Sequence, residues 1–81
     1  MDEVRVREVL EYIVRHLVDE PEAVRITEVE EEGVLRLRLT VAPGDVGKVI
    51  GRGGRTVRAI RDVVRAAGTR SGVRTAVEIL E

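Results

Sequence analysis

Hydrophobic and polar residues follow two different periods along this chain, and each change of period marks a predicted element. From Glu3 to Asp19 the apolar side chains recur every three or four residues, the spacing of one face of an α-helix. These side chains are Val6, Val9, Leu10, Ile13, Val14 and Leu17. Because Pro21 cannot continue a helix, we expect the helix to end before it.

A two-residue period follows and predicts a β-hairpin. In segment 34–42, four apolar residues alternate with polar ones, which is typical of a half-buried strand. The apolar set is Leu35, Leu37, Leu39 and Val41, and the polar set is Arg36, Arg38 and Thr40. Segment 24–30 precedes it across Glu31-Glu32-Gly33. In this first strand Val29 falls on the face opposite to Val24 and Ile26, so a bulge or an early end is expected there.

The second half of the chain predicts two helices and a last strand. Ala42-Pro43-Gly44-Asp45 is typical of a turn, and Asp45 is placed to cap a short helix that begins near Val46 and ends at the glycines of segment 51–54. A longer helix is predicted from Arg55 to Ala67, ended by Gly68. Segment 73–80 then alternates as a strand, with one apolar face made of Val73, Thr75, Val77 and Ile79.

These elements predict a single α+β domain over residues 1–81, in the order α-β-β-α-α-β. The two helices between the second and third strands are long enough for a crossover, so the third strand should lie parallel to the second. The result is a three-stranded mixed sheet with the second strand in the centre and three helices on one face.

Composition limits the classes of function. The 81 residues include no cysteine, which excludes disulfides, a thiolate nucleophile and cysteine-ligated metals. The N-terminal segment mixes charges into every turn and resembles neither a signal peptide nor a membrane span. No paired acid, base or nucleophile suggests catalysis. We therefore expect a cytoplasmic protein that is not an enzyme and has no cofactor or metal.

Charge is distributed unevenly along the chain. Residues 1–45 carry six basic and twelve acidic side chains, whereas residues 46–81 carry eight basic and three acidic ones. The net charge of −1 therefore hides a basic second half. Since the local field steers a polyanion more than the total charge does, a nucleic-acid partner remains compatible with this composition.

The basic half contains the glycine-rich segment Gly51-Arg52-Gly53-Gly54. It does not fit the dinucleotide pattern G-x-G-x-x-G, because Thr56 stands at the third glycine position, and it does not fit a Walker A loop. It is compatible with a plain junction between two helices. Its context favours a clamp for a sugar-phosphate backbone, because glycine allows close approach and the next helix begins with free N–H groups. Lys48 and Arg55 add charge beside it.

The segment Val46-Gly47-Lys48-Val49-Ile50-Gly51-Arg52-Gly53-Gly54-Arg55 resembles the signature of a KH domain, whose G-x-x-G loop binds single-stranded RNA. The order of elements is similar to the type II variety. LVDEPEAVRITEVE, VAPGDVGKVIGRGGR and AIRDVVRAAG together resemble the KhpA family of small bacterial single-KH-domain proteins. Where comparable sequences often have a polar third loop residue, this chain has Gly53.

The resemblance implies that four unpaired nucleotides lie in a groove between the first KH helix and the sheet, with the loop on their backbone. The groove residues that it implies are Val46, Val49, Ile50 and either Leu37 or Leu39. With one tyrosine and no other aromatic residue, base stacking is scarce, so we expect low sequence specificity. Arg55, Arg58, Arg61 and Arg65 form a stripe on the predicted helix from Arg55 to Ala67. Beyond Arg55, which belongs to the clamp, the residues Arg58, Arg61 and Arg65 are open to two interpretations, an RNA-binding surface or a solvated face.

The resemblance also implies partners. A site for four nucleotides gains affinity when a second module is linked to it, which favours a dimer. Relatives form homodimers and pair with KhpB, a larger KH-domain protein, and act as post-transcriptional regulators or RNA chaperones. Ala59, Val63 and Ala66 are small residues beside the arginine stripe and are our candidates for the dimer interface. The alternative is a dimerisation adaptor for a KhpB-like partner, in which RNA binding is vestigial.

Overall fold

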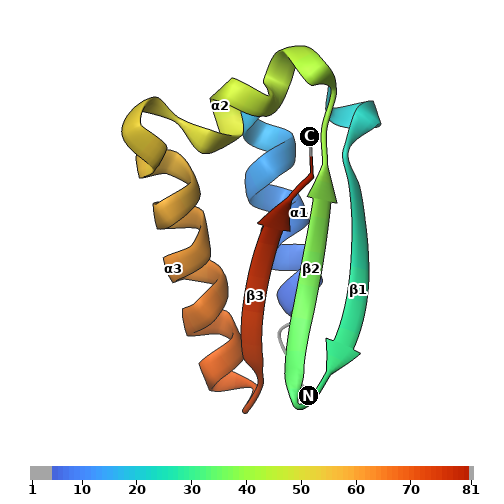
Figure 1. Ribbon diagram of the computed structural model, residues 1–81, viewed down its shortest axis with the longest axis vertical. Coiled ribbons are helices and arrows are strands. Elements are labelled where there is room, and N and C mark those ends of the chain that lie inside the picture. Colours follow the sequence, from blue (N-terminus) through green and yellow to red (C-terminus); the bar gives the residue numbers. More distant parts are fainter. Residues whose placement is uncertain (1–4, 81) are drawn as a thin grey trace.

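The computed structural model describes residues 5–80 and has the predicted order of elements (Figure 1). The helices are α1 (Val6–Leu17), α2 (Val46–Ile50) and α3 (Arg55–Arg70), and the strands are β1 (Arg25–Glu31), β2 (Val34–Thr40) and β3 (Arg74–Ile79). Short 3₁₀ turns cover Pro21–Ala23, Pro43–Asp45 and Arg52–Gly54.

The sheet has the predicted topology. β2 lies in the centre, antiparallel to β1 and parallel to β3. The β1–β2 register runs without interruption from Arg25 opposite Thr40 to Glu31 opposite Val34. The bulge or early end considered for β1 is therefore wrong: Val29 keeps its place in the ladder opposite Arg36, on the face that carries polar residues.

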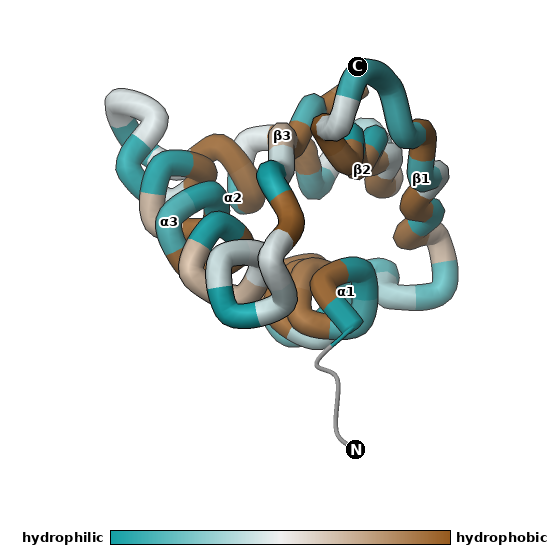
Figure 2. Tube along the Cα trace, turned by 90° about the horizontal axis from the view of Figure 1, so that it is seen from below, coloured by the Kyte–Doolittle hydropathy of each residue, from teal (hydrophilic) through white to brown (hydrophobic). Residues whose placement is uncertain are grey.

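The three helices cover one face of this sheet, which confirms the predicted α+β architecture (Figures 1 and 2). The inward residues of β2 and β3, Leu37, Leu39 and Val77, are buried against the helices. The helices contribute Leu10, Val14, Val49, Ile60 and Val64 to the same core. The other face of the sheet carries the charged residues that alternate with these strand positions, so the single core lies between two layers.

Helix α1 ends earlier than its hydrophobic pattern suggested. The predicted start at Glu3 lies outside the described residues, and the helix ends at Leu17 rather than Asp19. Its last backbone bond runs from the N–H of Val18 to the carbonyl of Val14, at 3.2 Å. The next two backbone N–H groups donate instead to the side chain of Asp45, which lies on another segment.

Helix α3 extends past the residue that was expected to end it. Gly68 lies inside the helix, which continues to Arg70, and Gly72, with φ of 72°, follows the helix end. A Cβ on Gly68 would come within 2.7 Å of the Val73 carbonyl oxygen and of the Thr75 side chain. Gly68 therefore allows α3 to approach β3 closely, and the prediction that it stops the helix is wrong.

Candidate nucleic-acid interface

The glycine loop connects α2 to α3 at the upper left of Figure 1. Gly51 has φ of 77° and ψ of 168°, a region that essentially only glycine occupies. A Cβ at this position would also lie 2.8 Å from the backbone nitrogen of Thr56. Gly51 is thus required twice, by its backbone conformation and by the close approach of α3.

The other two loop glycines have a different role. Gly53 and Gly54 also have positive φ, 65° and 77°, but a Cβ on either would meet nothing within 4 Å. Around them the backbone is open to an approaching molecule. The N–H of Gly54 donates to the Gly51 carbonyl at 3.1 Å, which holds the loop in a tight 3₁₀ turn.

Helix α3 begins directly after this turn, and no side chain caps its start. It has 16 residues, so its N-terminus carries the partial positive charge of a full helix dipole. The N–H of Arg55 itself donates to the carbonyl of Arg52 within the turn, so an anion placed at the loop meets mainly the positive end of the helix dipole and the side-chain charge.

Three arginines surround this helix start without acidic partners. Arg52, Arg55 and Arg58 are exposed, and none of them forms an ion pair with any residue in the range 5–80. Asp62, an acidic residue further along α3, pairs with Arg65 at 3.0 Å. The charges of these three arginines are therefore not paired with carboxylates of the described residues, and they add to the positive field at the loop.

The predicted arginine stripe divides into two parts with different surroundings. Arg55 and Arg58 have no acidic partner among the described residues, whereas Arg61 donates from Nε to the carbonyl of Val77 on β3 at 3.2 Å. Arg61 and Arg65 line a hollow of about 190 Å³ beside β3, together with Thr75, Ala76 and Val77. Arginine side chains thus continue from the loop along the α3–β3 seam, but there Arg61 is bonded to the backbone of β3 and Arg65 is paired with Asp62.

Lys48, predicted to reach the same nucleic-acid strand, has a partner in this structure. Its Nζ lies 3.5 Å from Oδ2 of Asp19, in the segment that follows α1. Both side chains are largely solvent-accessible, at 45% for Lys48 and 78% for Asp19. Lys48 therefore differs from the loop arginines in being paired.

A mostly apolar hollow lies between the start of α2 and the ends of β2 and β3, where the groove was expected. It has a volume of about 460 Å³ and is lined by Thr40, Val41, Pro43, Val46 and Leu80. Among the groove residues implied by the resemblance, Val46 lines this hollow and Ile50 is half-buried on α2. Thr40 and Leu80 were not among the predicted groove residues.

The remaining implied groove residues lie elsewhere. Val49, Leu37 and Leu39 have no exposed surface and belong to the core. They cannot line a groove in this conformation, and their burial explains why: each follows the ordinary pattern of a residue that faces the other layer. Val49, Leu37 and Leu39 instead form part of the core between the sheet and the helices.

The expected role of Asp45 is also corrected. Asp45 occupies the position before α2, but its side chain makes no capping bond to that helix. It is 2% exposed, and its carboxylate accepts the backbone N–H groups of Asp19 and Glu20, both at 3.1 Å. Sequence reasoning found the correct position but assigned its bonds to the nearest helix, because a contact across 26 positions leaves no local signal.

The candidate dimer residues share one exposed side of α3. Ala59, Val63 and Ala66 are all exposed, and Val63 is 47% exposed. Tyr12 and Leu17, two further exposed hydrophobic residues, lie on α1, which packs beside α3. These residues do not overlap with the loop arginines.

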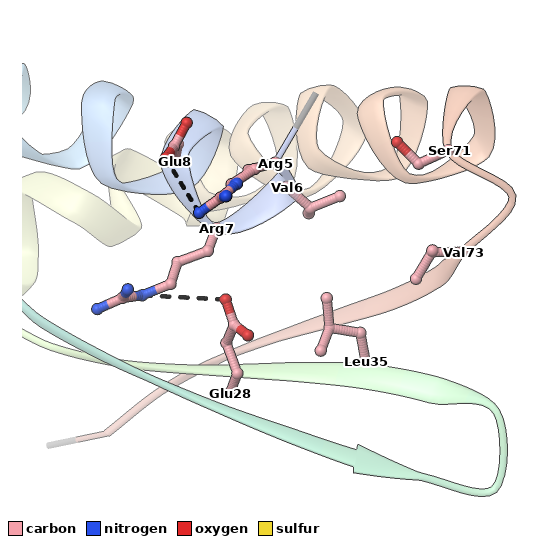
Figure 3. Close-up of a pocket in the computed structure, with 8 residues that line it drawn as sticks. All are labelled: Arg5, Val6, Arg7, Glu8, Glu28, Leu35, Ser71 and Val73. Atoms are coloured by element: carbon pink, nitrogen blue, oxygen red, sulfur yellow. Dashed lines mark ion pairs between the residues drawn. The ribbon is translucent and has the colours of Figure 1, made fainter. Parts of the chain in front are cut away.

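The opposite end of the molecule has a hollow of another kind, with a volume of about 390 Å³ (Figure 3). Its charged residues face one another: Arg7 lies 3.9 Å from Glu28, and Arg5 lies 3.9 Å from Glu8. Because its positive and negative groups are paired, it has no excess charge with which to attract a polyanion. Residues 5–80 contain neither a cluster of potential metal ligands nor a helix long and apolar enough to cross a membrane.

Together, the α+β fold and the glycine loop between α2 and α3 define a KH domain of type II topology. A family model described as "KhpA/KhpB, KH domain" matches residues 7–79. The chain belongs to this family.

Curated relatives match over nearly their full length. "RNA-binding protein KhpA" of Chlamydia trachomatis is 45% identical over 75 residues, covering 93% of this chain and 96% of the relative. Proteins of the same name from Clostridium acetobutylicum and Aquifex aeolicus are 46% and 41% identical, covering 91% and 93% of this chain and 99% and 95% of the relatives.

Solved structures of Era share the fold. Aquifex aeolicus Era bound to GDP·AlF4⁻ matches 91% of this chain with a TM-score of 0.66 and 16% identity. The match covers 29% of the Era chain. Another Era structure, in complex with MgGDPNP and a segment of 16S ribosomal RNA, gives the same TM-score and identity. At this identity the likeness extends to the fold alone.

Proposed function

We propose that this protein is a single-stranded RNA-binding module in which the loop Gly51–Gly54 clamps the sugar-phosphate backbone. The observation that carries the proposal is a set of three arginines around the start of α3, Arg52, Arg55 and Arg58, which form no ion pair with residues 5–80. Membership of the KhpA/KhpB family and relatives named as RNA-binding proteins support it. The protein then acts as a binding module and not as an enzyme, and the setting we propose is the cytoplasm.

The clamp determines how the RNA lies. Phosphates meet the N–H groups and arginines at the loop, and the bases turn towards the hollow lined by Val46 and Leu80. No aromatic ring is available there: the single tyrosine, Tyr12, lies on α1 with its ring 4.3 Å from His16. Because apolar contacts and phosphate contacts distinguish bases poorly, sequence preference should be weak.

The test is the binding of a fluorescent single-stranded RNA pool by the wild type and by the double variant Arg52→Asp, Gly53→Asp at two salt concentrations. A matched control is Arg70→Asp, Gly72→Asp. It makes the same change in composition, and Gly72, like Gly53, has positive φ and open space around its Cβ position. Circular dichroism first establishes that all three proteins are folded.

We expect the wild type and the control to bind, and their affinity to fall with salt at a slope that reflects roughly two to four phosphate contacts. The loop variant should not bind. If the loop variant binds as tightly as the control, or if the wild type does not bind at all, the loop is only a helix junction and the proposal fails.

We further propose that two copies associate through the exposed side of α3. Dimerisation would place two clamps on one RNA and raise the apparent affinity without new contacts in either site. Ala59 and Ala66 allow close approach of a second helix, and Val63 supplies exposed apolar area. Sedimentation should show a dimer for the wild type and a monomer for Val63→Asp, with Thr69→Asp as the exposed control on the same helix.

The adaptor hypothesis predicts a different outcome of the same experiments. A protein that serves only to pair with a larger KhpB-like partner would dimerise or bind that partner while showing no salt-dependent RNA binding. RNA binding by the wild type that is abolished in the loop variant would exclude it.

A further inference from the structure

Asp45 joins two segments that are distant in the sequence. Its carboxylate is buried between the end of α1 and the start of α2, and both of its oxygens are used. Oδ1 accepts the backbone N–H of Asp19, and Oδ2 accepts that of Glu20. Hydrogen bonds to an ionised group are stronger than neutral ones, so this contact fixes the segment after α1 against α2.

The residue fixed in this way carries a second carboxylate, which faces the site. The backbone of Asp19 bonds to Asp45, and the side chain of Asp19 lies 3.5 Å from Nζ of Lys48. Lys48 lies on α2, three residues before the first glycine of the loop. The one lysine of the chain therefore lies beside the glycine loop and already forms an ion pair with Asp19.

We propose that Asp19 competes with RNA phosphate for Lys48, and that Asp45 is the positioning residue that holds Asp19 in place for this. The inference rests on the proposed RNA-binding function and deepens it. The loop arginines bind phosphate directly, whereas Lys48 contributes only after it exchanges one anionic partner for another. The pair therefore lowers RNA affinity.

The exposure of both side chains sets the size of this effect. Ion pairs at such exposure are weak, so a phosphate can displace Asp19 readily. When a phosphate binds Lys48 in the wild type, it loses a condensed cation, and the displaced carboxylate of Asp19 attracts a cation in turn. The net number of cations released at Lys48 is therefore small. Without the carboxylate, Lys48 should count as a full phosphate contact in the salt dependence.

The central variant is Asp19→Asn. It removes the side-chain charge and keeps the backbone N–H that Asp45 holds, so the fold should be unaffected. The matched control is Glu30→Gln, which makes the same change in net charge at an exposed position of β1 that forms no ion pair with the described residues. Lys48→Gln, alone and combined with Asp19→Asn, completes a double-mutant cycle.

We expect Asp19→Asn to bind the RNA pool about two- to fivefold more tightly than the wild type at low salt. The slope of log affinity against log salt should steepen by about 0.7. Glu30→Gln should change the RNA affinity and the salt slope less than Asp19→Asn does. In the Lys48→Gln background, Asp19→Asn should no longer raise the affinity.

Three results would overturn the inference: equal gains for Asp19→Asn and Glu30→Gln, a gain that survives Lys48→Gln, or weaker binding by Asp19→Asn. The last would mean that the pair orients Lys48 for the phosphate. If neither the wild type nor Asp19→Asn binds RNA, the proposed function itself fails, which distinguishes the two failures.

The positioning role of Asp45 has its own readout. In an Asp45→Asn background, which removes one of the two acceptors, the gain from Asp19→Asn should shrink because Asp19 no longer stands beside Lys48. If Asp19→Asn raises RNA affinity as much in this background as in the wild type, Asp45 does not position Asp19 and has a structural role alone. Should Asp45→Asn not fold, Asp45→Ser, which also keeps an acceptor, allows the same comparison.

Discussion

Two surfaces of this protein are rich in arginine, and they use it in opposite ways. On the outer face of the sheet, Arg36 and Arg38 both pair with Glu78 at 3.2 Å, and Arg36 also lies 3.2 Å from Glu31. At the glycine loop, Arg52 and Arg55 have no acidic partner among the described residues. The same side chain stabilises strand pairing in one place and leaves an open positive surface in the other.

The comparison shows why the number of arginines says little about nucleic-acid binding. A paired guanidinium has its hydrogen bonds and charge satisfied within the protein, so a phosphate must displace a carboxylate to reach it. An unpaired one beside a helix start adds to the dipole of that helix. The useful signal is therefore whether an arginine has an acidic partner, and Arg52 and Arg55 have none among the described residues.

The largest effect should come from removing the conformation that the loop requires. Gly51→Ala forces a side chain into a backbone region that disfavours it and places Cβ against Thr56, so we expect a decrease of about 2–4 kcal/mol in the free energy of unfolding. Urea denaturation measures it. RNA binding should be abolished even where the protein is still folded, because the loop must change shape.

Gly47→Ala is the control for this substitution. Gly47 lies in α2, and a Cβ there would meet nothing within 4 Å. Alanine is the better helix former, so this variant should be as stable as the wild type or more stable by up to about 1 kcal/mol. Equal destabilisation by both variants would contradict the special role assigned to Gly51.

The next largest decrease in stability should come from removing the buried carboxylate of Asp45, which joins the start of α2 to the segment after α1. Asp45→Ala leaves two backbone N–H groups without acceptors, which should cost about 1–3 kcal/mol of unfolding free energy, measured by urea denaturation. Asp62→Ala, which breaks an exposed pair with Arg65, should cost less than about 1 kcal/mol. A cost for Asp45→Ala as small as that for Asp62→Ala would mean that the bonds to Asp19 and Glu20 contribute little.

The sequence predicted the layers and the strand order because those depend on local period and on chain connectivity. Alternation in β2 placed Leu37 and Leu39 inward, and the two helices before β3 required a crossover to a parallel strand. The sequence-based prediction of the end of α3 was wrong, because Gly68 allows close packing of α3 against β3 and does not end the helix. From sequence alone the two uses of glycine look the same.

For the candidate site, the loop and its charges were identified from sequence, but their partners were not. Nothing local shows that Asp45 bonds to Asp19 and Glu20, or that Asp19 then faces Lys48, since these contacts join segments more than 24 positions apart. The groove residues were confused with the core for a similar reason: Val46 and Val49 are both apolar residues on one short helix, and only packing separates the lining residue from the buried one.

Removing charge from the two arginine surfaces tests the comparison directly. Arg52→Gln, Arg55→Gln should weaken RNA binding by roughly fivefold at 0.1 M salt for each phosphate that is no longer neutralised, and should flatten the salt slope by about 0.7 for each. Arg36→Gln, Arg38→Gln makes the same change in charge on the sheet and should leave the salt slope unchanged. Fluorescence anisotropy at several salt concentrations measures both. Equal weakening by the two double variants would show that net charge, rather than the unpaired loop arginines, determines affinity.

The smallest effect should come from releasing the arginines of the sheet. Glu78→Gln removes the partner that Arg36 and Arg38 share, while Arg36 keeps its pair with Glu31, and because these side chains are about 40% exposed the unfolding free energy should fall by less than about 1 kcal/mol. The guanidinium groups on the strands have neither a glycine loop nor a helix start beside them, so RNA affinity should rise by less than about twofold. Asp62→Asn adds the same charge on α3, beside the basic seam, and should raise affinity more than Glu78→Gln does. If Glu78→Gln instead produces the larger gain, the sheet face binds RNA once its carboxylate is removed, and the assignment of the site to the loop must be changed.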